Sequence, residues 1–235
     1  MKILAFESSA KAAGAAILSD GVLLGESYLN SGLTHSCTLL QMAEDLLRTC
    51  ALSSADIDVV AAAAGPGSFT GVRIGVAAAK GFAWGRELPL YGVSTLEAMV
   101  RGAAMYDGIY CACMDARRQQ VYNALFAVAD GAPRRLCPDR AVGLDVLREE
   151  LIKFENPIFL VGDGALLCYN SLLESLPKLR LLPEHLRQQR AAGVALAAQA
   201  AIDAGQAGDA AALVPNYLRL SQAERERNER LKQES

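Results

Sequence analysis

The chain has 235 residues, a length that suits one large domain or two lobes of about 100 residues each. Hydrophobic residues make up 52% and charged residues 21%, a composition that excludes disordered and membrane-spanning classes. The formal net charge of −3 argues against a surface that binds polyanions generally. The N-terminal apolar run ends at Glu7, too early for a signal peptide, so we expect a cytoplasmic protein.

Six cysteines and two histidines limit the chemistry of the chain. No two cysteines form a C-x-x-C pair, and a core of this size needs no disulfides, so we expect reduced thiols. His35 and His185 lie about 150 positions apart, which argues against a histidine-rich metal site.

The residue pattern of each half of the chain predicts two apolar strands followed by an Asp-Gly hairpin dipeptide. These are residues 2–6, 14–18 and 20–21 in the first half, and 109–114, 121–128 and 130–131 in the second. An acidic residue, Glu7 or Asp115, ends the first strand of each half. Since two hairpins can resemble each other by chance, this repeat alone leaves duplication open.

The remaining pattern alternates helices and strands. The predicted helices are residues 33–50, 69–85, 94–105, 143–153, 165–175 and 190–204, and the further strands are 22–29, 57–64, 88–93 and 157–161. We therefore predict an α/β protein of two lobes, residues 1–107 and 108–220, each a mixed sheet with helices, followed by a charged tail at 221–235.

A glycine-rich segment, GPGSFTGVRIG at residues 65–75, lies between a predicted strand and a predicted helix, where α/β proteins often bind phosphate. Its spacing matches neither a P-loop nor a dinucleotide fingerprint, which favours a tight turn. In the following helix Gly71, Gly75, Ala78 and Phe82 share one face. Small residues there allow close approach of another helix, either within the same lobe or from another subunit.

Several segments together carry a resemblance to a known family. They are residues 2–21, 33–47, 62–84, 90–99, 114–122, 161–165 and 215–219, of which GPGSFTGVRIG is the most specific. The chain resembles the TsaB family of bacterial tRNA threonylcarbamoyladenosine biosynthesis proteins. This resemblance implies the two-lobed actin-like ATPase (ASKHA) fold, with duplicated mixed sheets flanked by helices.

The resemblance also implies the role of a non-catalytic scaffold. Its partners would be a TsaD-like metal-dependent paralogue, which transfers threonylcarbamoyl to the adenosine beside the tRNA anticodon, and a TsaE-like ATPase. The chain would form a homodimer when alone, contact tRNA only through the complex and have no membrane contact. TsaD binds its metal through an H-x-x-x-H pair, and the matching positions here are Thr95 and Met99, so we expect neither a metal nor a catalytic residue.

Two sets of site residues follow from this resemblance. The candidates for the partner interface are Leu39, Met42, Leu46, Gly71, Gly75, Ala78 and Phe82. The candidates for a residual phosphate loop are Glu7, Ser8, Ser9 and Asp115. Because Ala116 and Arg117 replace glycines in the second lobe, we expect no required cofactor, and ATP or ADP only weakly or at the partner interface.

Other functions remain as alternatives. An ATP-dependent small kinase of the same fold would rest on Glu7-Ser8-Ser9. A peptidase would need a base, and neither His35 nor His185 stands in a nucleophile motif. A local basic cluster in lobe two is either a solvated face or a tRNA contact within the complex. It consists of Arg117, Arg118, Arg134, Arg135 and Arg140.

Overall fold

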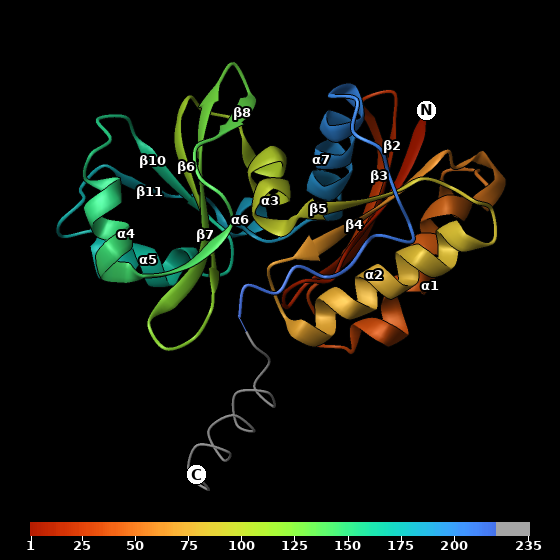
Figure 1. Ribbon diagram of the computed structural model, residues 1–235, viewed down its shortest axis with the longest axis horizontal. Helices are drawn as coiled ribbons and strands as arrows, with labels where there is room; N and C mark the ends of the chain where they lie inside the picture. Colours follow the sequence, from red (N-terminus) through yellow and green to blue (C-terminus); the bar gives the residue numbers. More distant parts are fainter. Residues whose placement is uncertain (220–235) are drawn as a thin grey trace, which may run out of the picture.

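The computed structural model describes residues 1–219, and the predicted charged tail at 221–235 lies outside them. Two lobes stand side by side, each built on a β-sheet with helices packed against it (Figure 1). Within residues 1–219 no helix is long and apolar enough to cross a membrane.

Lobe one contains a five-stranded sheet in the order β3-β2-β1-β4-β5. Its strands are β1 (Lys2–Glu7), β2 (Ala13–Ser19), β3 (Val22–Leu29), β4 (Val59–Gly65) and β5 (Leu90–Ser94). β1 is antiparallel to β2 and parallel to β4, so the sheet is mixed. The predicted hairpin is confirmed at Asp20 and Gly21, which both adopt positive φ.

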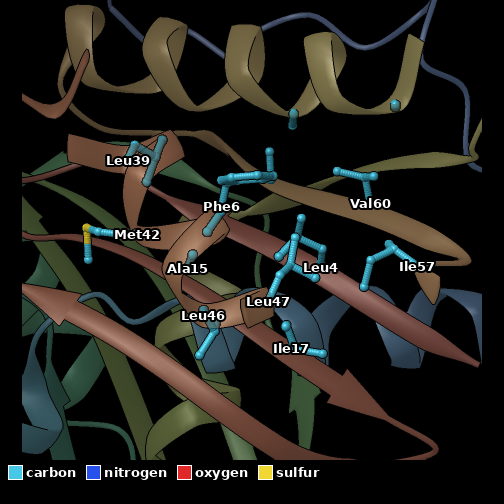
Figure 2. Packing of buried hydrophobic residues seen from close by; sticks show 14 of the residues in the cluster. Leu4, Phe6, Ala15, Ile17, Leu39, Met42, Leu46, Leu47, Ile57 and Val60 are labelled. Carbon is cyan, nitrogen blue, oxygen red and sulfur yellow. The ribbon is translucent and has the colours of Figure 1, made fainter. Parts of the chain in front are cut away.

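Two helices cover one face of this sheet, α1 (His35–Thr49) and α2 (Phe69–Trp84), and the short 3-10 helix η1 (Ser54–Asp56) follows α1. Leu39, Met42 and Leu46 recur on one side of α1 and pack on Leu4 and other residues of the sheet (Figure 2). Full burial of each such aliphatic side chain contributes about 1.5–3 kcal/mol, so this face holds α1 on the sheet.

Lobe two repeats the arrangement of lobe one. Its strands are β6 (Gly108–Asp115), β7 (Gln120–Ala129), β8 (Ala132–Arg135), β9 (Arg140–Gly143), β10 (Ile158–Val161) and β11 (Leu179–Leu181). The order β8-β7-β6-β10-β11 corresponds strand for strand to lobe one, with β9 added beside β7. Helices α4 (Leu144–Leu151) and α5 (Ala165–Leu172) pack beneath it. The predicted internal repeat is therefore confirmed as two lobes of one topology.

Three helices lie where the lobes face each other: α3 (Thr95–Ala103), α6 (Glu184–Arg187) and α7 (Ala191–Asp203) (Figure 1). α7 follows lobe two in sequence but packs on the lobe-one sheet, where Val194 and Ala198 join a core that contains Ile3 and Ala5. The predicted boundaries are wrong here, because residues 191–203 of the predicted second lobe belong to lobe one. Sequence periodicity identified the helix and could not show which sheet its apolar face covers.

Candidate functional site

A cavity of about 540 Å³ lies between the two lobes. It is lined by the turn after β1 (residues 9–11), the start of α2 (66–69), the turn after β6 (115–117), Asp163, and the C-terminal segment 216–219. The ends of β1 and β6 carry the two acidic residues that the sequence singled out, Glu7 and Asp115. The internal repeat thus brings equivalent turns of both lobes to one cavity.

The side chains of the first predicted phosphate loop point inward. Glu7 is 1% exposed, and its Oε1 accepts a hydrogen bond from the Ser9 N–H at 2.6 Å. The Ser8 hydroxyl donates to the Gly71 carbonyl oxygen at 2.9 Å, so it is committed to α2. Burial raises the pKa of Glu7 to about 7. Of this turn it is Ser9 that lines the cavity.

In the second turn, after β6, the Asp115 side chain is hydrogen-bonded to the backbone of the same turn. The Asp115 carboxylate accepts from the Arg117 N–H at 2.7 Å and lies 3.6 Å from the Arg117 guanidinium. Arg117, Arg118 and Gln119 all have φ between 56° and 64°, a left-handed conformation that glycine adopts without cost. The backbone of this turn therefore has the left-handed conformation that glycine favours. The Arg117 side chain lines the cavity.

Asp163 is a cavity residue that the sequence analysis did not select. It lies between Gly162 and Gly164 after β10 and accepts a hydrogen bond from the Gln189 amide at 3.0 Å. Burial raises its pKa, and the nearby charge of Asp115 acts in the same direction. The sequence carries a local signal for this residue, since an acidic residue stands between two glycines directly after a strand.

The segment 215–219 closes one side of the cavity, and we call it the C-terminal strap. The Asn216 N–H donates to the Ala64 carbonyl at 2.6 Å, and the Tyr217 ring stacks on Phe69 with centroids 4.5 Å apart. The Arg219 guanidinium donates to the Ala116 carbonyl oxygen of lobe two. The strap therefore connects both lobes across the cavity.

Most of the predicted partner-interface residues are covered by the chain itself. Leu39, Met42 and Leu46 are 1%, 8% and 8% exposed, because they form the core beneath α1. Gly71 and Gly75 are buried against Ser8. Gly71 and Gly75 therefore pack within lobe one, the first of the two alternatives for α2. Leu39, Met42 and Leu46 are core residues of the same lobe, so the structure does not support a direct partner contact through these five residues.

Ala78 and Phe82 are half-buried, and Phe82 reaches a second cavity, of about 680 Å³, on the outer side of lobe one. This cavity, which we call the α1 groove, has an apolar floor that includes Ala43, Leu47 and Leu52. Leu40 lines it and is 54% exposed. The exposed apolar surface of α1 thus borders Phe82 and lies beside the buried candidates of α1.

The predicted basic cluster is divided by ion pairs. Arg135 pairs with Glu97 at 3.0 Å and with Asp139 at 2.5 Å. Arg140 pairs with Glu150. Arg140 is therefore satisfied within lobe two, and Arg135 also joins lobe two to Glu97 of the interlobe helix α3, whereas Arg117 belongs to the interlobe cavity.

The comparisons with known proteins agree with these two lobes. The family profile described as TsaD, tRNA N6-adenosine threonylcarbamoyltransferase, matches residues 31–226. The tRNA threonylcarbamoyladenosine biosynthesis protein TsaB of Bacillus subtilis is 32% identical over 224 residues, covering 95% of this chain and 96% of that protein. This chain belongs to the TsaB family.

Solved structures show the fold of this TsaB-family chain. A Pseudomonas aeruginosa protein described as similar to the peptidase YeaZ has a TM-score of 0.76 at 24% identity, covering 93% of this chain and 99% of that one. A ROK hexokinase from Thermus thermophilus has a TM-score of 0.50 at 14% identity, covering 87% and 100%. The predicted actin-like ATPase fold is confirmed, and at these identities the likeness extends to the fold alone.

Thr95 and Met99, which the resemblance matched to a metal-binding pair, carry packing side chains in this TsaB-family chain. Thr95 is 0% and Met99 3% exposed, and Met99 belongs to the core between α3 and lobe two. Among residues 1–219 no group of three His, Cys, Asp or Glu side chains is arranged to hold a metal ion. His35 is occupied by a hydrogen bond with the Ala10 carbonyl at 2.8 Å.

Proposed function

We propose that this chain is a non-catalytic subunit that binds and supports a TsaD-like enzyme in the synthesis of threonylcarbamoyladenosine in tRNA. One observation carries the proposal: Thr95 and Met99, which the family resemblance matches to metal-binding histidines of the enzyme, are buried packing residues of α3. Thioether sulfur and a buried hydroxyl are poor ligands for a hard catalytic ion. The chain keeps the shape of its catalytic relative without the metal chemistry.

The α1 groove is the surface that we propose for the partner. Its apolar floor is bordered by charged residues, among them Glu44, Arg48 and Asp56. An apolar centre with a charged rim is typical of protein interfaces. Leu40 projects from α1 as an exposed apolar anchor. A TsaD-like protein would place an apolar side chain in this groove and pair with its rim.

The remaining components are proposed on the family relationship. A TsaE-like ATPase completes the complex, tRNA is contacted through the complex, and the free chain forms a homodimer. The chain requires no cofactor of its own, and ATP or ADP would bind weakly or where the two proteins meet. The kinase-like alternative is not favoured, since Glu7 and Ser8 are committed to internal hydrogen bonds.

Two experiments test this proposal. Depletion of the protein should lower threonylcarbamoyladenosine in bulk tRNA, measured by mass spectrometry, and an unchanged level would refute the role. Leu40→Arg should reduce co-purification of the TsaD-like partner at least tenfold, because it places a charge in the apolar groove. Leu166→Arg is the matched control: Leu166 is a similarly exposed leucine on a helix of lobe two, 48% against 54%. Equal yields for the two variants would move the interface elsewhere.

A further inference from the structure

Helix α3 joins the two lobes through a buried core. Its residues Leu96, Met99 and Val100 are buried in one apolar cluster with Tyr110 and Phe126 of lobe two. This cluster contains side chains of β6 and β7, the central strands of the second sheet. On the side of lobe two, α3 is therefore held by its apolar face.

The contact of α3 with lobe one is equally close. Ala98 of α3 lies in the cluster that contains Ile3 and Ala5 of β1. The α3 backbone also touches α7, since a Cβ atom at Gly193 would find no room beside the Ala98 carbonyl oxygen. Parting the lobes would expose one of these clusters to water, and burial of apolar surface is the main term that keeps a domain folded. We therefore expect the lobes to keep a fixed angle in the folded chain.

The C-terminal strap bounds the interlobe cavity and is held much more lightly. The chain after α7 runs back along lobe one and ends between the lobes (Figure 1). Residues 215–219 lie in no helix or strand, and all of them are exposed or half-buried. Within residues 1–219 the strap makes one hydrogen bond to lobe two, from the Arg219 guanidinium to the Ala116 carbonyl oxygen. Segments with exposed backbone and little buried apolar surface are the first parts of a protein to open.

The contacts of the strap with lobe one converge on Tyr217. Its ring stacks on Phe69 with centroids 4.5 Å apart. Arg73 completes the arrangement, because its Nε donates to the Tyr217 hydroxyl at 2.7 Å and its guanidinium lies 3.8 Å from the Phe69 ring centroid. Next to these side chains, the Asn216 N–H donates to the Ala64 carbonyl oxygen at 2.6 Å. These contacts are few and lie at the surface, so they can break without disturbing either core.

We propose that the C-terminal strap is a lid on the interlobe cavity, which lifts while α3 holds the lobes at a fixed angle. Lifting releases the Phe69 ring and the Ala64 and Ala116 carbonyl oxygens, and it admits solvent and small solutes to the cavity. The inner wall carries Ser9, whose buried hydroxyl has no hydrogen-bond partner within residues 1–219. A solute with a polar group would satisfy this hydroxyl. The lid is a property of this chain and does not depend on the proposed partner.

The methionines distinguish lifting of the lid from parting of the lobes. Met114 lines the cavity and is 3% exposed, whereas Met99 is buried between α3 and lobe two. Met42 is buried beneath α1, and Met105, which is 50% exposed, gives the reference rate. Hydroxyl-radical footprinting of the full chain measures the oxidation of all four. Because the oxidation of a covered side chain follows the population of the open state, lifting of the lid should oxidise Met114 and leave Met99 and Met42 protected.

Two variants loosen the lid at different attachments. Tyr217→Ala removes the stack on Phe69 and should raise the oxidation of Met114 about two- to tenfold relative to the reference methionine. Arg219→Ala removes the attachment to lobe two and should change the oxidation in the same direction. The matched control is Tyr28→Ala. Tyr28 is 36% exposed against 39% for Tyr217 and also lies beneath an arginine, but it belongs to β3 and does not line the cavity.

The pattern of oxidation decides the proposal. A rise at Met114 without a rise at Met99, in either lid variant, supports the lid. An unchanged Met114 rate in both variants would overturn it. A parallel rise at Met99 would also overturn it, because the lobes would then be parting, and so would an equal rise at Met114 in Tyr28→Ala. Arg219→Ala alters a side chain outside both cores, so it decides the test alone if Tyr217→Ala does not fold.

Discussion

Ser8 occupies the space that a side chain at Gly75 would need: a Cβ atom there would lie 2.5 Å from the Ser8 Oγ. The glycine face of α2 is therefore closed from inside the lobe by the turn after β1. This contact explains why small residues recur on α2 without requiring a second subunit. It also predicts which glycines of the helix can be replaced.

Gly75→Ala should lower the free energy of unfolding by about 1–3 kcal/mol, because the new methyl group overpacks against Ser8. Gly81→Ala is the matched control on the same helix, where a Cβ atom would meet nothing within 4 Å. It should raise the free energy of unfolding by about 0.5–1 kcal/mol, since alanine favours the helix. Urea denaturation measures both, and equal effects would contradict the contact.

The sequence predicted what local pattern and repetition can encode. Helical spacing placed α1 and α2, and the two Asp-Gly dipeptides located both hairpins. Its failures concern contacts distant in sequence. The spacing of Leu39 and Met42 marked a buried face correctly, but whether the chain or a partner buries it depends on the sheet below. The C-terminal strap joins the cavity through the tertiary fold, which no local pattern records, and the two glycines beside Asp163 do not show that it faces the other lobe.

Stability should fall as pH rises through the range set by Glu7. Its pKa is about 7 in the folded chain against an ordinary 4.5, so between these values the unfolded chain loses a proton that the native state keeps. The linked loss of stability is about 3 kcal/mol between pH 4.5 and pH 7. Glu7→Gln should remove this part of the slope in urea titrations at several pH values. An identical slope in the wild type and the variant would show that Glu7 is not its source.

A fragment of residues 1–107 should not fold alone, although it contains every strand of the first sheet. α7 covers the face that carries Ile3 and Ala5, and it comes from residues 191–203. Without it, apolar surface of the sheet is exposed to water. We expect broad amide signals and dye binding from the fragment, and a sharp spectrum from the full chain. A cooperative unfolding transition of the fragment would show that α7 is dispensable.

The C-terminal strap should depend on the Tyr217 ring more than on its hydroxyl. The hydroxyl accepts a hydrogen bond from Arg73 at 2.7 Å, and the ring stacks on Phe69 with centroids 4.5 Å apart. Tyr217→Phe should weaken the attachment of the strap by about 1 kcal/mol or less, because it removes one hydrogen bond of a partly solvated residue. Tyr217→Ala loses the stacking as well, about 0.5–1.5 kcal/mol beyond the lost buried area.

Release of the strap frees the side chain of Arg219, which is held on the Ala116 carbonyl oxygen and is a residue that trypsin recognises. Tryptic cleavage there should accelerate several-fold in Tyr217→Ala and little in Tyr217→Phe. Tyr106→Ala breaks a comparable stack with Phe159, 5.4 Å between centroids and remote from the strap, and should leave the cleavage rate unchanged. Equal acceleration in both alanine variants would mean that general destabilisation, and not the contact with Phe69, controls the strap.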